Sequence, residues 1–112
     1  MKFKGIFEGN NSAYGRLILS GKKDSRGKEK GKPWIKRETP TEQVWIDHIE
    51  GKQDKDGKLL PALGIIPINE DNKCKWGCID VDVYNLDHKK VIDKIKELKF
   101  PLITFRLSLI HI

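Results

Sequence analysis

The chain has 112 residues, of which 38% are hydrophobic and 34% charged, a composition typical of a soluble globular protein with one core. No apolar run approaches the ~18 residues that a membrane helix needs, and the first residues lack the apolar core of a signal peptide. Two cysteines, Cys74 and Cys78, are too few for a disulfide scaffold and are poorly placed for zinc, so we expect reduced thiols in a cytoplasmic protein.

Positive charge is in excess and unevenly spread. Lys and Arg total 22 against 16 acidic residues, a net charge of +6. Residues 22–32 hold six of the basic residues and only two acids, and together with Gly21, Gly27 and Gly31 they predict a mobile basic loop. The six are Lys22, Lys23, Arg26, Lys28, Lys30 and Lys32. Two interpretations remain open: binding of a phosphate-rich partner, or a solvated hairpin tip.

The first half of the chain predicts three strands and a helix. Phe3 to Glu8 and Ser12 to Leu19 are expected to pair across a turn, and Pro33 to Lys36 forms another short strand. Thr39 with Glu42 three residues later predicts a helix start, and Gly51 is a natural stop. The buried stripe of this helix would hold Val44, Trp45, His48 and Ile49.

The second half predicts a hairpin followed by a helical crossover. Residues 54–57 and 69–73 predict turns, and the apolar run Ala62 to Ile68, with Pro67 near its end, is expected to pair with a strand over 75–84. Asp87 to about Lys99 predicts an amphipathic helix capped by Asp87. Leu102 to Arg106 then begins a strand next to the 75–84 strand.

Two carboxylates interrupt the predicted 75–84 strand. Asp is depleted in strands, and Asp80 and Asp82, two residues apart, would share one face while Ile79, Val81 and Val83 share the other. Their Cα atoms would lie roughly 6.5 to 7 Å apart, close enough for both carboxylates to bind one divalent ion or a pair of ions. A metal site, solvent-exposed acids, and acids hydrogen-bonded to loops all fit this pattern.

Five segments in one order extend the argument beyond this pair. They are Gly5 to Gly9, Ser12 to Gly15, His48 to Gly51, Leu63 to Pro67, and Trp76 to Asp82. Over most of residues 3–106 this order resembles the archaeo-eukaryotic primase superfamily, in the branch of phage primase-polymerases and TOTE conflict-system primases. The Ile-Asp-Val-Asp segment is the most specific match, and the glycine and His48 matches are softer.

The resemblance implies an α+β, RRM-like primase core with a mixed sheet and flanking helices, in a bacterium or a phage-infected host cell. It implies that Asp80 and Asp82 hold Mg²⁺ or Mn²⁺ and act in nucleotidyl transfer from nucleoside triphosphates on a single-stranded DNA template, with a helicase as a possible further part of the protein. Arg106 and His48 are candidate nucleotide or phosphate contacts, each with a structural alternative. The tryptophans Trp34, Trp45 and Trp76 could stack on bases or belong to the core.

The end of the chain departs from the family. Members of the family continue into a Ser- and Gly-rich turn bearing a histidine, and supply a third acidic residue further on. Residues 107–112 instead match the translation of CTG TCT CTT ATA CAC ATC, a transposon end used to tag sequencing libraries. We therefore expect residues 1–106 to be the N-terminal part of a primase-polymerase domain, inactive as truncated, and 107–112 to be adapter read-through, so His111 is assigned no role.

Other function classes fit parts of the same pattern. A single-stranded nucleic-acid-binding module without catalysis would use the basic segment and the tryptophans, and would need neither metal nor Asp80. A nuclease or a glycosyltransferase could use an Asp-x-Asp pair for its own metal. Nucleotide-sugar enzymes, however, normally place a nucleotide-binding α/β half before the pair, and the first 70 residues show no repeated strand-helix units.

Overall fold

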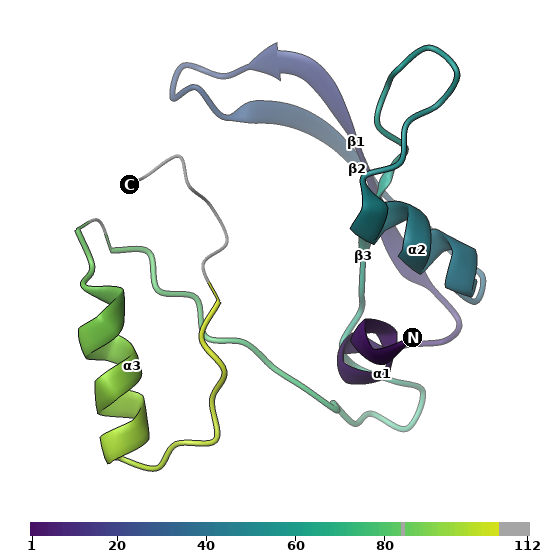
Figure 1. Cartoon of the computed structure of the whole chain (residues 1–112). Coiled ribbons are helices and arrows are strands. Elements are labelled where there is room, and N and C mark those ends of the chain that lie inside the picture. Colours follow the sequence, from purple (N-terminus) through teal and green to yellow (C-terminus); the bar gives the residue numbers. More distant parts are fainter. Residues whose placement is uncertain (84, 106–112) are drawn as a thin grey trace. The chain divides into compact units, whose positions relative to one another are not determined.

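The computed structural model describes residues 1–83 and 85–105. Its elements, shown in Figure 1, are α1 (Lys2–Phe7), β1 (Tyr14–Lys23), β2 (Glu29–Lys36), α2 (Glu42–Glu50), β3 (Ala62–Gly64) and α3 (His88–Glu97). Contacts divide the chain into two compact units, the first from Met1 to Cys78 and the second from Ile79 onward. The expected α+β class is confirmed. Within the described residues, no helix has the length and apolar character to cross a membrane.

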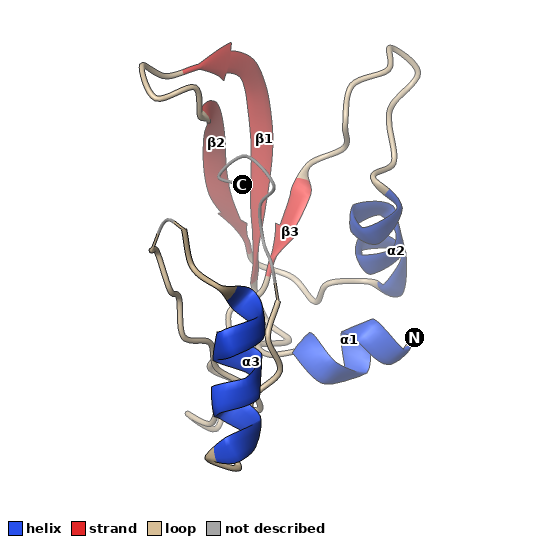
Figure 2. Ribbon diagram, turned by 60° about the vertical axis from the view of Figure 1, so that its left-hand side comes forward, coloured by secondary structure: helices blue, strands red, loops and turns tan. Residues whose placement is uncertain are grey.

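The first unit is built on a three-stranded sheet with β1 at its centre (Figure 2). Both pairings are antiparallel, so the mixed sheet expected from the sequence is not formed by the described residues. The short strand β3 pairs with β1 and places Gly64 opposite Gly15. The bounds of β3 also fall short of the predicted 62–68 strand, because the chain after Gly64 leaves the ladder.

The predicted hairpin between residues 62–68 and 75–84 is wrong. The described residues show no pairing between 62–68 and 75–83, and a single isolated bridge joins Ile68 to Cys74, just before the predicted second strand. The carbonyls of Ile66 and Ile68 accept hydrogen bonds from Asn10 instead, from its backbone N–H at 2.8 Å and its side-chain amide at 3.1 Å. Because Asn10 uses acceptors that a hairpin partner would need, the N-terminal segment takes the place of the predicted strand.

Residues Lys2–Phe7 form helix α1 where a strand over Phe3 to Glu8 was predicted. Phe3 and Phe7 lie one helical turn apart, and their ring centroids are 4.8 Å from each other. The Phe3 ring meets Trp45 edge to face, and the Phe7 ring meets Trp76 in the same way. A segment of six apolar and polar residues is too short to distinguish the two-residue period of a strand from the 3.6-residue period of a helix. The aromatic contacts at positions i and i+4 favour the helix.

The bounds of helix α2 agree with the prediction except at its first residues. The predicted buried stripe is wrong at His48 and Ile49, because His48 is exposed and Ile49 is 45% exposed. Thr41, two residues after the predicted cap at Thr39, is the N-cap, and its side-chain oxygen accepts a hydrogen bond from Val44 N at 3.3 Å. Gly51 ends the helix in the left-handed conformation, as expected. The side chain of Trp45 is 2% exposed and that of Tyr14 is 1% exposed, so these two residues form the centre of the first unit.

Three turns share one design. Each begins with Asp or Asn, has a residue with positive φ in its fourth place and ends with Lys: 24–28, 54–58 and 69–73. In each turn the first side-chain oxygen accepts hydrogen bonds from the backbone N–H groups two and four residues later. The first N–H also donates to the final carbonyl, which closes the turn. The turns predicted at 54–57 and 69–73 are thus confirmed, and the mobile loop expected at 22–32 is a hairpin with an ordered tip.

In the second unit, α3 has the N-cap that the sequence predicts, with Asp87 accepting from Lys90 N at 3.1 Å. The helix ends at Glu97 instead of Lys99. Val91, Ile92 and Ile95 are half-buried and no residue of α3 is fully buried. The outer face carries the ion pairs Lys89–Asp93 and Lys94–Glu97, in agreement with the predicted solvent exposure.

Candidate functional site

Asp80 and Asp82 lie in an exposed, irregular segment of the second unit. The predicted strand over 75–84 is wrong for residues 75–83, and Tyr84 lies outside the described residues. Ile79, Val81 and Val83, expected to pack, are 77%, 55% and 61% exposed. A strand needs a neighbour for its backbone groups, and no described strand pairs with this segment. Residues 102–105 likewise form no strand, so the expected crossover pairing is also wrong for them.

The two carboxylates have the chemistry of a hard-cation site, but the described residues supply only part of one. Both side chains are exposed, and neither takes part in an ion pair with a described residue. Carboxylate oxygens suit Mg²⁺ and Mn²⁺. Within residues 1–83 and 85–105 no group of three or more His, Cys, Asp or Glu side chains could hold a metal ion. Asp80 and Asp82 would therefore leave most of the metal coordination shell to water and substrate.

The six basic candidates do not form one cluster. Lys22 and Lys23 end β1, where a register irregularity between Leu19 and Lys23 breaks the regular ladder. The tip residue Arg26 pairs with Asp24 at 3.4 Å. The pKa of Asp24 is lowered, first by the hydrogen bond from Lys28 N and also by the backbone and guanidinium of Arg26. The cations at the hairpin tip are thus accompanied by a carboxylate.

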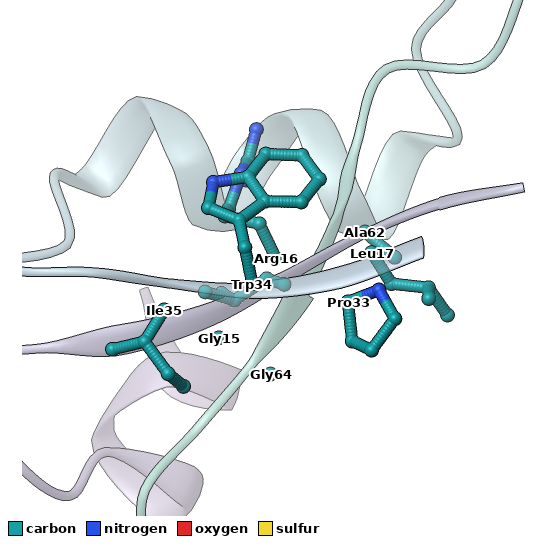
Figure 3. A pocket seen from close by; sticks show the side chains of 9 residues that line it. Gly15, Arg16, Leu17, Pro33, Trp34, Ile35, Ala62 and Gly64 are labelled. Carbon is teal, nitrogen blue, oxygen red and sulfur yellow. The ribbon is translucent and has the colours of Figure 1, made fainter. Parts of the chain in front are cut away.

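Lys30 and Lys32 belong instead to one face of the sheet, which we call the basic face. Side chains alternate along a strand, so β2 presents Lys30, Lys32, Trp34 and Lys36 on this face. The register places Arg16 of β1 directly opposite Trp34. Figure 3 shows both side chains leaving the strands on the same side. The sequence analysis did not identify Arg16 as a candidate. Its alternation with Tyr14 and Ile18 places it on one face of a strand, but nothing near it in the sequence shows that it lies opposite Trp34.

Carboxylates from neighbouring segments reach the end of the basic face nearest Tyr14. Lys36 pairs with Glu38 at 3.0 Å, and the Tyr14 hydroxyl donates to Glu38 at 3.1 Å. The pKa of Asp47 on α2 is lowered, first by the Gln43 amide and further by Lys52 and Arg16. Arg16, Lys30 and Lys32 form no ion pair within the part of the chain that the structure describes. The far end of the face therefore keeps its positive charge.

The three tryptophans differ in environment. Trp45 is buried, and Trp76 is half-buried, with its indole N–H donating to Phe7 O at 2.8 Å. Both are packing residues, which is one of the two interpretations that the sequence allowed. Trp34 is 37% exposed on the basic face. It is the tryptophan best placed to stack on a ligand.

The opposite face of the sheet is apolar. A shallow hollow of about 500 Å³ lies against it, and Figure 3 shows Pro33 and Ile35 directed away from the side that Trp34 occupies. Gly15, Ala62 and Gly64 are among the residues that line it. Arg16 is the one charged residue among those that line the hollow, and its side chain points to the opposite side of the sheet.

His48 has a structural role in the first unit. Its Nδ1 accepts a hydrogen bond from Leu63 N at 3.1 Å, which joins α2 to β3. The neutral ring then carries its hydrogen on Nε2, where it is a donor suited to a phosphate or carbonyl oxygen. The other predicted phosphate contact, Arg106, lies outside the described residues, as do residues 107–112.

The structure thus collects Arg16, Lys30, Lys32 and Trp34 on one sheet face and leaves Asp80 and Asp82 accessible in the other unit. A scan against models of protein families found no match to this chain, and searches of curated proteins and solved structures also found none.

Proposed function

We propose that this chain forms part of the catalytic domain of a DNA primase-polymerase, an enzyme that joins nucleotides on a single-stranded DNA template. The observation that carries the proposal is the pair Asp80 and Asp82, two residues apart, exposed and without an ion-pair partner in the described chain. It is supported by the order of the five matching segments that end in this pair.

In this proposal Asp80 and Asp82 hold the divalent ions that bind the triphosphate of the incoming nucleotide. Such ions supply charge stabilisation to the attacking and leaving oxygens during in-line transfer. The two carboxylates contribute negative charge and orient the ions. Two carboxylates alone bind Mg²⁺ weakly, so this chain by itself is expected to bind metal weakly and to synthesise nothing.

The metal site is tested on this chain by titration with Mn²⁺, whose unpaired electrons broaden the NMR signals of nearby amides. We expect selective broadening of residues 79–83 that is lost in Asp80→Asn and in Asp82→Asn. The matched control is Asp93→Asn, which removes an exposed acid from α3 in the same unit and should leave the broadening unchanged. Equal broadening around Asp93 in the wild-type chain would argue for unspecific binding to surface acids.

The activity itself is tested with the gene extended past Arg106. The extended product is expected to synthesise or extend primers on single-stranded DNA with Mg²⁺ or Mn²⁺, and Asp80→Ala or Asp82→Ala should abolish synthesis. Synthesis that persists in both variants would exclude the proposed role of the pair. Cleavage of DNA, or transfer from a nucleotide sugar, would instead assign the pair to another metal enzyme.

A further inference from the structure

We propose that the basic face of the first unit binds single-stranded nucleic acid, with Arg16, Lys30 and Lys32 on the phosphates and Trp34 stacked on a base. The inference rests on the proposed function only for the role of the bound strand as template. It keeps Lys30, Lys32 and Trp34 from the sequence expectation, adds Arg16 near the start of β1, and leaves out the residues of the hairpin tip.

The cations of the face are arranged in a line. Lys30 and Lys32 are two residues apart on β2, so their side chains leave the same face about 6.5 to 7 Å apart. Arg16 continues the line opposite Trp34, two register positions from the pair formed by Ile18 and Lys32. Lys30 and Lys32 are exposed, and Arg16 is half-buried. A line of cations along a strand fits a linear polyanion better than a single compact anion.

Trp34 supplies the second element of a single-strand site. Trp34 follows Lys30 and Lys32 on the same face of β2. Its side chain and that of Arg16 leave the sheet on the same side in Figure 3. The Arg16 guanidinium is also placed over the Tyr14 ring, with its central carbon 5.9 Å from the ring centroid. That contact with a buried ring orients Arg16 before any ligand arrives. Aromatic rings beside cations bind bases of any sequence, because every base has a stacking face.

The charge of the face favours nucleic acid over an acidic protein surface. Trp34 is the aromatic side chain on this face that is not buried, and Ile18, opposite Lys32, is an exposed apolar side chain on the same face. An extended single strand presents regularly spaced phosphates and flat bases, which match cations and one accessible ring. A duplex would present phosphates but no accessible base face, so we expect weaker binding of duplex DNA.

The experiment measures the fluorescence anisotropy of a short labelled oligothymidylate with the 112-residue chain in EDTA. We expect salt-dependent binding in which the slope of log K against log salt is about −2, as three phosphate contacts predict. Lys32→Gln should lower the affinity and reduce that slope by roughly one contact. Trp34→Ala should weaken binding by on the order of tenfold, and Trp34→Phe should restore most of it.

Matched controls distinguish binding by the basic face from attraction by the net positive charge of the chain. Arg26→Gln removes one positive charge from the hairpin tip, where Asp24 already pairs with it, and should change the affinity little. Asp80→Asn with Asp82→Asn should not weaken binding, which keeps this test independent of the metal site. Circular dichroism checks that each variant is folded. Because Lys32 is exposed, Lys32→Gln tests the proposal even if Trp34→Ala disturbs the sheet.

Three outcomes would overturn the proposal. One is the absence of oligothymidylate binding at low salt. Another is equal loss of affinity in Arg26→Gln and Lys32→Gln with none in Trp34→Ala, which would indicate unspecific attraction by net charge. The third is tighter binding to anionic lipid vesicles than to the oligonucleotide, with the same dependence on Lys32, which would assign the face to a membrane surface.

Discussion

His48 of α2 accepts a hydrogen bond on Nδ1 from the backbone N–H of Leu63, the central residue of β3. Leu63 lies opposite Arg16 in the sheet, so this bond connects the helix to the strand that flanks the basic face. The histidine therefore helps to hold β3, a strand of only three residues, at the edge of the sheet. Two consequences for substitution at this position can be measured.

His48→Ala removes the acceptor and is expected to lower the free energy of unfolding by about 1 kcal/mol, as for a typical hydrogen bond. His48→Asn can present a side-chain oxygen to the same N–H and should recover part of the loss. Urea denaturation measures both. Hydrogen exchange at the Leu63 amide should become faster in the alanine variant. Unchanged exchange there would show that the bond does not protect the strand.

The Lys36–Glu38 pair predicts a loss of stability in acid. The pKa of Glu38 is lowered from its ordinary value of 4.5, first by the hydrogen bond from Lys36 and also by that from Tyr14. A carboxyl with a lowered pKa in the folded state stabilises that state fully above pH 4.5, and this contribution is lost as the pH falls through the folded value. Glu38→Gln should therefore narrow the difference in melting temperature between pH 7 and acidic buffer.

Other carboxylates, including Glu8, Asp24, Asp47 and Glu70, also have lowered pKa values and will contribute to the wild-type acid transition. The comparison of Glu38→Gln with the wild-type chain isolates the contribution of Glu38 to this transition. Identical pH profiles for the two proteins would contradict the assignment. Tyr14→Phe serves as a second probe, because it keeps the buried ring and removes only the hydroxyl that donates to Glu38.

Two glycines of the N-terminal segment should respond in opposite ways to alanine. A Cβ at Gly9 would overlap the carbonyl oxygen of Ile66, a backbone atom that also accepts from Asn10. Gly9→Ala is expected to cost about 1 to 3 kcal/mol, because the backbone must shift. Gly5 lies inside α1 with open space around it, so Gly5→Ala should raise stability by roughly 0.5 to 1 kcal/mol. Chemical denaturation of both variants tests the contrast, and equal effects would show that Gly9 is not packed as described.

The fourth residue of the repeated turn provides another matched set. Gly57 has a φ of +78°, and Asn72 in the equivalent place has +58°. Gly57→Ala should destabilise the chain by about 1 kcal/mol, because a Cβ is disfavoured in this region. Asn72→Gly places the favoured residue there and should be neutral or slightly stabilising. Thermal melts measure the order of the variants, and a stabilising Gly57→Ala would contradict the turn geometry.

Local signals were enough to predict part of this fold. Helices α2 and α3 were predictable because a cap, a 3.6-residue period and a stop all lie within each segment. The turns after Asp54 and Asn69 were predictable because their hydrogen bonds span five residues. Segment 3–8 was ambiguous by itself, since Trp45 and Trp76 decide its conformation from far along the chain.

Pairing between distant segments was the part that the sequence could not supply. Nothing near Gly64 indicates that it lies opposite Gly15. Nothing near Lys75 indicates that residues 75–83 have no strand partner among the described residues. The residues of the candidate site likewise differ in whether local sequence was enough to find them. Asp80 and Asp82 were found from their spacing alone, whereas the grouping of Arg16 with Trp34 needed the register of two strands.

The repeated five-residue turns also set an expectation for the order of folding. Each closes through hydrogen bonds within its own five residues, so it can form before the rest of the chain is ordered, whereas β3 must find β1 across about fifty residues of chain. We expect the β1–β2 hairpin, nucleated by the turn at Asp24, to be protected early in pulsed hydrogen exchange and the amides of β3 to be protected late. Early protection of β3 would contradict this order. A short local turn, placed at the end of two long strands, would then template the surface on which the last strand docks.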